Sequence, residues 1–247
     1  MRNRHILFFL AFIVFPWLLP AQTPTADDLL LRVDANAIFN TIEYDGEMII
    51  ENQNRRYVKI FKAWARGNSD SFLEFFNPED RGTKYLKRDG RLYIYSPDNE
   101  KVMLISGHML KESMMGSDMS YEDTIDNASL SSRYDPVLAG EEIWNNRSAW
   151  VLELNAIKRT ESYPKRKLWI EKETGDLLHY ELFALSGGKL KEYNLLKVDV
   201  LAGKRFPVEI EIMDLLRRGS KTTFLMKNVI LDKPIPGSVF SQRNLER

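Results

Sequence analysis

Within the segment 206–214 (FPVEIEIMD), residues 208–212 alternate strictly between apolar and acidic side chains. Val208, Ile210 and Ile212 are apolar, and Glu209 and Glu211 stand between them. A period of two puts successive side chains on opposite faces of an extended chain. The segment is therefore predicted to be a β-strand with one buried face.

Similar strand-like segments recur along most of the chain. Turn signals separate them, such as Thr174-Gly175-Asp176, Gly187-Gly188 and Arg218-Gly219-Ser220. About eleven strands at hairpin-like spacing predict a mainly β protein with one antiparallel sheet, highly curved or closed. The other expected strands are 46–52, 56–66, 71–76, 91–95, 101–105, 149–158, 167–172, 177–184, 189–201 and 222–231.

Two segments break this pattern. Residues 25–38 carry apolar side chains at helical spacing after a possible N-cap, Thr25, and acids in the first turn, so an N-terminal helix packed in or across the sheet is expected. Residues 106–128 have no period of two and hold four methionines. We expect this second segment to be a helical or irregular excursion across the sheet.

The first 21 residues have the pattern of a secretory signal. Arg2 and Arg4 precede an apolar stretch over 6–19, and the small Ala21 marks the expected cleavage point. The stretch is shorter than the ~20 residues of a spanning helix, although a retained anchor is the alternative. We expect cleavage after Ala21, a single domain over 22–247 and a location outside the cytoplasm. Without a cysteine after the apolar run, no lipid anchor is expected.

Composition narrows the possible chemistry. Lys and Arg total 35 and Asp and Glu total 35, a balance that argues against nucleic-acid binding. The chain has no cysteine and only 3 histidines, so thiol chemistry is excluded and a histidine-rich metal site is not expected. No nucleophile, phosphate-loop or dinucleotide motif is present. We therefore expect no enzyme activity, no cofactor and no metal. A hydrolase using an unrecognised carboxylate pair is the rival interpretation from another class.

Basic clusters occur at two places. The run Lys165-Arg166-Lys167 begins an expected strand, and Arg217-Arg218 is expected at the tip of a hairpin. The simplest interpretation of the first run is a solvated charge cluster that blocks edge-to-edge aggregation.

Aromatic and aliphatic residues are abundant for a water-soluble sheet. They fill an ordinary core, or they line an apolar cavity that the methionine-rich segment closes; methionine suits a lid because its side chain adapts to different apolar surfaces. The cavity candidates are Trp64, Phe72, Tyr93, Tyr95, Trp150, Leu152, Trp169 and Tyr180. The lid candidates are Met114, Met115, Gly116, Asp118 and Tyr121.

Several motifs resemble the outer-membrane lipoprotein-sorting proteins of the LolA/LolB-like superfamily. The segment 114–123 (MMGSDMSYED) is similar to the MGSD-x-[ST]-YED motif of one branch, and it follows RLYIYSP at 91–97 and KVMLI at 101–105. Other matches are Arg81-Gly82-Thr83, Leu168-Trp169-Ile170 and IPGSVF at 235–240. The resemblance covers nearly all of the chain after the signal segment.

The resemblance implies a half-open β-barrel with helices over its mouth and an apolar cavity for acyl chains. The implied function is a periplasmic carrier or chaperone that moves lipoproteins or lipids toward the outer membrane. An inner-membrane ABC or RND-type transporter is the implied partner. The alternative is an accessory partner of such an export complex that binds protein rather than lipid. Within the motif, Gly116 is expected to permit a tight turn, and Asp118 is expected to cap a helix starting near Ser120.

Overall fold

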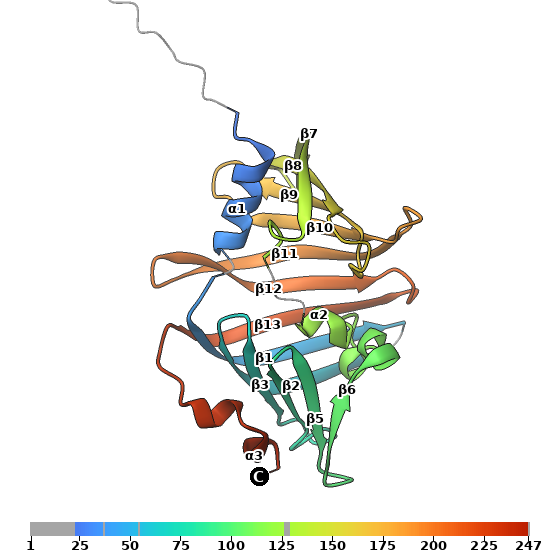
Figure 1. Ribbon diagram of the computed structural model, residues 1–247, viewed down its shortest axis with the longest axis vertical. Helices are drawn as coiled ribbons and strands as arrows, with labels where there is room; N and C mark the ends of the chain where they lie inside the picture. The colour runs from blue at the N-terminus through green and yellow to red at the C-terminus, as the bar shows by residue number, and fades with distance from the viewer. Residues whose placement is uncertain (1–22, 37, 54, 126–128, 247) are drawn as a thin grey trace, which may run out of the picture.

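The computed structural model describes residues 23–36, 38–53, 55–125 and 129–246 (Figure 1). The expected signal segment, 1–21, lies outside the described residues, as do residues 126–128 of the methionine-rich segment. The described helices are α1 (Ala26–Asn36), α2 (Tyr121–Ile125) and α3 (Gln242–Leu245). Single 3₁₀ turns are η1 (Gly107–Lys111), η2 (Met114–Gly116) and η3 (Gly237–Phe240).

The described strands form one curved, 13-stranded antiparallel sheet with the order β6-β5-β4-β3-β2-β1-β13-β12-β11-β10-β9-β8-β7. The predicted mainly β fold is thereby confirmed, with slightly more strands than expected. The strands are β1 (Thr41–Asn52), β2 (Arg55–Arg66), β3 (Asp70–Phe75), β4 (Lys84–Arg88), β5 (Arg91–Ser96), β6 (Lys101–Ile105), β7 (Tyr134–Trp144), β8 (Arg147–Ala156), β9 (Lys165–Glu171), β10 (Leu177–Phe183), β11 (Lys189–Leu201), β12 (Lys204–Asp214) and β13 (Ser220–Leu231).

Two strands were missed because their sequences break the usual rules. In β4, Lys84 and Lys87 are both buried, and the Lys87 ammonium donates to the carbonyls of Asn68 and Ile125. In β7, Pro136 and Gly140 interrupt the pattern. An edge strand tolerates proline, and the pairing of β7 with β8 shifts register between Leu138 and Gly140.

The pairing of β1 with β13 joins the two ends of the chain in the middle of the sheet. Met48 of β1 lies opposite Phe224 of β13, and Ile210 of β12 lies opposite the same Phe224. One face can therefore be followed across all strands. We call it the inner face, and it carries the buried side chains of Met48, Phe61, Leu152 and Ile170.

Two segments cover the inner face (Figure 1). Helix α1 packs its Leu29, Leu30 and Val33 against β8 and β9, which confirms the predicted N-terminal helix. The segment 106–125, which we call the cover segment, lies over β1 to β5. It is irregular, with η1, η2 and the short α2, as the missing periodicity indicated.

The outer face of the first half of the sheet has its own cover at the C-terminal end of the chain. Phe240 and Leu245 are almost fully buried against Phe72 and Leu86. The Arg88 guanidinium donates to the Phe240 carbonyl over 3.1 Å, which ties η3 to β4. This half of the sheet therefore lies between two covers.

Candidate functional site

The underside of the cover segment is apolar. Met114 is 5% exposed and packs with Phe61, Phe75 and Tyr85 of the inner face. These rings lie 5.5 to 5.9 Å apart, centroid to centroid. Gly46 allows the arrangement, since a Cβ atom there would stand 2.1 Å from the Phe61 ring. The contact between cover and sheet is thus methionine on aromatic rings, an adaptable kind of packing.

Tyr85 adds a polar group to this apolar contact through its hydroxyl. Its hydroxyl donates to Met115 Sδ over 3.0 Å and lies 3.4 Å from the Tyr121 hydroxyl. Burial, followed by the neighbouring Tyr121, raises the pKa of Tyr85 well above its ordinary value of 10.0. The phenol therefore stays neutral and serves as a hydrogen-bonding group under the cover.

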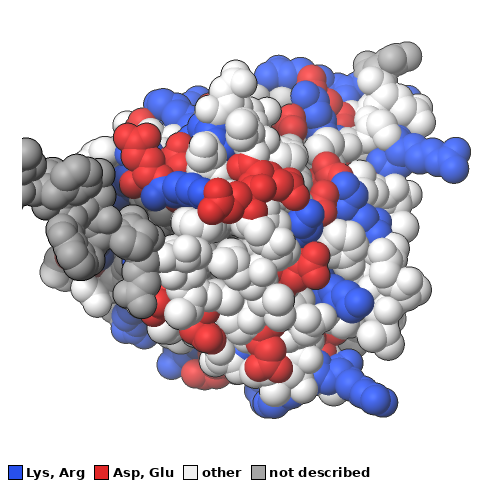
Figure 2. Space-filling view, turned by 90° about the horizontal axis from the view of Figure 1, so that it is seen from above, with Lys and Arg blue, Asp and Glu red and all other residues white. Residues whose placement is uncertain are grey.

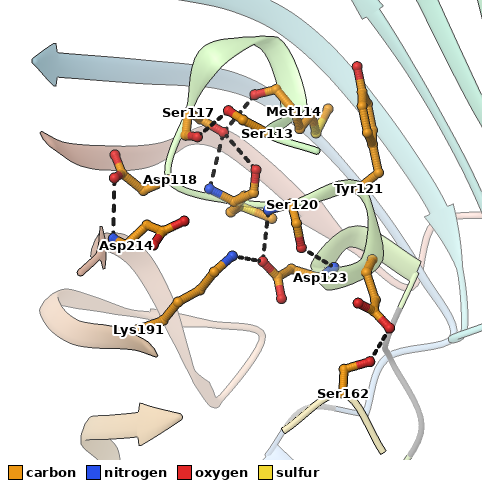
Figure 3. Close-up of polar contacts among 12 residues, drawn as sticks. Ser113, Met114, Ser117, Asp118, Ser120, Tyr121, Asp123, Ser162, Lys191 and Asp214 are labelled. Atoms are coloured by element: carbon orange, nitrogen blue, oxygen red, sulfur yellow. Dashed lines mark hydrogen bonds and ion pairs between the residues drawn. The ribbon is translucent and has the colours of Figure 1, made fainter. Parts of the chain in front are cut away.

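Asp118 fastens the cover segment to the middle of the sheet. Its side chain is 1% exposed, and it accepts hydrogen bonds from the hydroxyls of Thr222 (2.7 Å) and Ser220 (3.0 Å). It also accepts from the Asp214 backbone N–H, and its own N–H donates to Thr222 Oγ1 over 2.9 Å. One carboxylate thus connects the cover to both β12 and β13. Figure 3 shows its contact with Asp214 of β12.

Arg217 provides a second attachment from the β12–β13 turn. Its guanidinium donates to the Gly116 carbonyl over 2.9 Å and also to the Ser117 carbonyl. Gly116 has φ +81°, a conformation that glycine adopts at little cost, so the predicted tight turn is present. The turn presents both carbonyls to the one guanidinium.

Asp123 provides the third attachment, an almost fully buried ion pair. Lys191 Nζ lies 2.5 Å from Asp123 Oδ2, and their side chains are 8% and 7% exposed. The Tyr163 hydroxyl donates to Asp123 Oδ1 over 2.7 Å. Burial, followed by the Asp123 charge, raises the pKa of Tyr163, so the phenol remains a donor. Ser162 donates to Glu122 beside this pair (Figure 3).

The expectation that Asp118 caps helix α2 is wrong. The residue at that position is Ser120, whose hydroxyl accepts from the Asp123 N–H while Asp123 Oδ2 accepts from the Ser120 N–H. This is a reciprocal capping box. Asp118 is instead turned toward β13, because Thr222 and Ser220 offer it two buried hydroxyl donors.

The structure divides the predicted cavity residues among separate clusters. Trp64, Phe72, Tyr93 and Tyr95 lie on the outer face beneath the C-terminal segment. Trp150, Leu152 and Tyr180 lie on the inner face under α1, and Trp169 belongs to an outer-face cluster with Ala149 and Val151. The predicted lid residues all belong to the cover segment, where Met114, Met115 and Tyr121 contact the sheet.

Two depressions of the surface are small and lined in part by charged residues. One of about 180 Å³ lies between α1 and the β9–β10 turn, beside Arg32, Trp150 and Lys172. The other, about 250 Å³, lies beside Lys165, Arg166 and Phe183. Both are below the ~300 Å³ typical of ligand pockets. Beneath the covers, the inner face is occupied by buried side chains such as Met48, Phe61 and Leu152.

Comparison with known proteins decides the family. The model of an "Uncharacterized protein"-like family matches residues 67–247. The chain belongs to this family. The match includes the cover segment, the three attachments described above and the C-terminal segment. A search of curated proteins gives no significant match.

Three crystal structures have the same fold. A DUF1329 family protein from Desulfovibrio piger is 24% identical with a TM-score of 0.81, and the match covers 89% of this chain and 97% of that one. A putative outer membrane lipoprotein-sorting protein domain from Vibrio parahaemolyticus is 19% identical, with a TM-score of 0.76 and coverage of 90% and 97%. A LolA superfamily protein from Nitrosomonas europaea is 20% identical, with a TM-score of 0.73 and coverage of 90% and 100%. This family thus has the LolA/LolB-like fold that the motifs indicated.

One histidine, His179 of β10, is buried against tryptophan side chains. His179 is 1% exposed, stacks on Trp144 at 4.0 Å and places Nδ1 2.7 Å from Asn194 Oδ1. Within the described ranges, no group of three or more His, Asp or Glu side chains is placed to hold a metal ion. None of the helices described has the length and apolar character to cross a bilayer.

Sequence reasoning missed the residues that hold the cover from the sheet side. Of these residues, Lys191 was the easiest to predict from the sequence. It falls in phase with the buried Tyr193 on β11, which is an unusual position for a lysine. Arg217 was recognised as a hairpin tip but not as an attachment. Thr222 and Ser220 carry no local signal, since their partner Asp118 is about 100 residues away in the sequence.

Proposed function

We propose that this protein carries acyl chains of lipoproteins or lipids in the periplasm, held between the inner face and the cover segment 106–125. One observation carries the proposal: the cover lies on aromatic rings through methionines, and its main polar attachments are few, at Asp118, Arg217, Asp123 and the Ile125 carbonyl that Lys87 contacts. Such a cover can leave as a unit once these contacts are broken.

The hydrophobic effect favours an acyl chain in the place that the cover segment leaves. Lifting the cover exposes Phe61, Phe75 and Phe224 to water, which is unfavourable in proportion to the apolar area. An acyl chain in the same place removes that area from water again and gains ~0.8 kcal/mol for each CH₂ group it buries. Methionines suit this exchange, because their flexible side chains pack equally well on rings or on a hydrocarbon chain.

The location and the partners belong to the same proposal. The basic and apolar N-terminal segment supports export, and the LolA/LolB-like fold supports carriage toward the outer membrane. A carrier of this kind receives its cargo from an inner-membrane ABC or RND-type transporter. It binds and releases without catalysis.

Two measurements test the proposal. The protein is purified from its native envelope without detergent and extracted for lipid mass spectrometry; co-purifying phospholipid or lipopeptide is expected. A fatty-acyl probe with a photoreactive group is then crosslinked to the protein. Crosslinks are expected on Met114, Met115 and Phe224, and the outer-face Trp64 and Tyr93 serve as internal controls.

Two outcomes would contradict the carrier. Protein that holds no lipid and does not bind the acyl probe would favour the protein-binding accessory partner instead. Crosslinks confined to the outer-face cluster around Trp64 would move the acyl site beneath the C-terminal segment, away from the cover.

A further inference from the structure

Alternate turns of the sheet meet at one edge. Because neighbouring strands are antiparallel, the β1–β2, β12–β13 and β10–β11 turns and the β8–β9 loop all lie at the same ends of their strands. In Figure 1 the three hairpins point to the right. We call the part of this edge formed by these four connections the hairpin rim, and it comprises the described residues within 52–57, 157–165, 184–189 and 215–219. The β3–β4 loop and the β5–β6 turn, which carry Glu79, Asp98 and Glu100, lie farther along the same edge and are not part of the rim.

Each turn of the hairpin rim exposes a large apolar side chain. Tyr57 is 45% exposed, Ile157 is 54%, Leu185 is 76% and Leu216 is 75%. Single exposed apolar residues are common on protein surfaces. Four of them on adjacent turns of one edge form a repeated pattern, with one apolar tip on each turn.

Basic side chains flank these apolar tips. Among the described residues, Arg56, Lys158, Arg159, Lys165 and Arg218 have no acidic partner within ion-pair distance, and all are exposed. The neighbouring acids Glu51 and Glu161 are paired with Lys221 and Arg133. Lys and Arg side chains project from the right-hand edge in Figure 2, the side of the rim in Figure 1. The rim therefore combines apolar tips with uncompensated positive charge.

The opposite edge of the sheet has a different character. Its turns are formed by Gly67-Asn68-Ser69, Asp89-Gly90, Asn145-Asn146, Lys172-Glu173-Thr174-Gly175-Asp176 and Ala202-Gly203. The turns themselves carry no large apolar residue, although Ile143 and Val200 in the strands beside them are 75% and 64% exposed. In the longest turn Asp176 is paired with Arg147 and Arg205. Curvature and hairpin geometry are common to both edges, so they do not explain the pattern at the rim.

We propose that the hairpin rim docks on the surface of a membrane rich in anionic phospholipids. The charges identify the occupant: exposed cations without acidic partners complement phosphate headgroups, while apolar tips enter the boundary between headgroups and acyl chains. The residues of this surface are Tyr57, Ile157, Leu185 and Leu216 at the tips, with Arg56, Lys158, Arg159, Lys165 and Arg218 beside them. Docking goes beyond the proposed carrier function and does not depend on it.

Arg217 connects the hairpin rim with the cover segment. It lies between Leu216 and Arg218 of the rim, and its guanidinium holds the carbonyls of Gly116 and Ser117 in the cover segment. The hairpin that meets the membrane is thus the hairpin that fastens the cover. Docking brings the edge of the cover to the lipid surface.

Vesicle flotation tests the docking. The protein is used in the form in which it accumulates in the envelope. It is mixed either with vesicles of phosphatidylcholine alone or with vesicles of phosphatidylcholine and phosphatidylglycerol. Binding to the anionic vesicles is expected, and it should weaken as salt shortens the Debye length from ~10 Å at ~0.1 M to ~3 Å at ~1 M. Arg218→Glu should weaken binding by about fivefold or more, and Leu216→Asp by about tenfold.

Matched variants at the opposite edge provide the controls. Ile143→Asp replaces a residue of equal exposure, 75%, and Lys204→Glu reverses an exposed charge in the β11–β12 turn. Both should bind like the unchanged protein, and both share its N-terminal segment. Equal binding to neutral and anionic vesicles, or no binding, overturns the proposal. So does a loss that is as large in the control variants as in the rim variants. Acyl-probe binding is measured separately, so a failed carrier and a failed docking surface are distinguished.

Discussion

The two covers of the inner face are held in different ways. Helix α1 inserts Leu29 and Leu30, 2% and 1% exposed, among the aliphatic side chains of β8 and β9. The cover segment lays methionines on aromatic rings and depends on a buried ion pair and on hydrogen bonds made by Asp118, Arg217 and Lys87. Aliphatic side chains packed to crystal-like density resist separation. Polar attachments are directional and can be lost together.

In the proposed carrier, this difference gives the two halves of the sheet different roles. The half under α1, with its largely aliphatic core, is the fixed part of the molecule. The other half has its apolar face closed by the segment that we propose detaches. A carrier needs both: a rigid sheet and one cover that yields to cargo.

The largest effect is expected from breaking the ion pair of the cover segment. Asp123→Asn leaves the Lys191 ammonium buried without its counter-charge, which costs about 3–5 kcal/mol. Because the cover is detachable, the cost should appear as opening of residues 106–125, measured as faster amide hydrogen exchange there. Glu112→Gln, at an exposed position of the same segment, is the control. Uniform acceleration across the whole sheet would show that the cover does not open alone.

A comparable change under α1 should act on the whole molecule. Leu30→Ala leaves a cavity in the aliphatic core, with a loss of about 2–5 kcal/mol in the free energy of unfolding. Urea denaturation should show a lower midpoint. The amide exchange rates of the cover segment, compared with those of the sheet, should keep the order they have in the unchanged protein. The exposed neighbour Leu31, at 55%, provides the matched control Leu31→Ala. If Leu30→Ala opened only the cover, the assignment of fixed and movable covers would be reversed.

A smaller effect is expected at the second attachment. Asp118→Asn keeps the shape of the side chain, but the amide nitrogen cannot accept from Thr222 or Ser220, at a cost of about 1–3 kcal/mol. Acyl-probe affinity should rise, since a less stable cover yields more readily to cargo. A lower affinity at unchanged thermal stability would instead make Asp118 part of the cargo contact.

The smallest effect concerns pH and the fixed half. Hydrogen bonds from Arg147 lower the pKa of Glu171 below its ordinary value of 4.5, and the β9–β10 turn that follows accepts a hydrogen bond from Asn36 of α1 at the Gly175 carbonyl. A lowered pKa in the folded state contributes stability above pH ~4.5 that is lost as the pH falls further. The midpoint temperature of thermal unfolding should therefore fall on acidification below that value. Glu171→Gln should flatten the dependence, and an unchanged slope in this variant would remove Glu171 from the account.

Local patterns in the sequence predicted most of the sheet, because alternation is a property of a single strand. Residues 206–214 alternate on their own and are found in β12. Lys84 and Lys87 concealed β4, because their burial depends on acceptors and rings supplied by other elements. Pro136 concealed β7, because only the topology shows that β7 is an edge strand.

The candidate site was predictable in its location but not in its contacts. The methionines and the lost period of two indicated an excursion across the sheet over 106–128, and its described residues form the cover segment 106–125. The wrong cap at Asp118 shows the limit: Ser120 and Asp123 form a local box that the sequence contains, while the partners of Asp118 come from β12 and β13. The inner and outer positions of Trp150 and Trp169 likewise depend on register, since a shift of one residue exchanges the two faces.

A reversible lock on the cover tests the central claim most directly. Asp118 and Thr222 are in side-chain contact at 2.7 Å, and the chain has no cysteine of its own, so a D118C/T222C pair can form a single disulfide. Acyl-probe affinity is measured on the same sample before and after reduction, with disulfide formation checked by mass spectrometry. The account predicts that the oxidised protein does not bind the probe and that reduction restores binding. Equal binding in both states would contradict an acyl site beneath the cover segment.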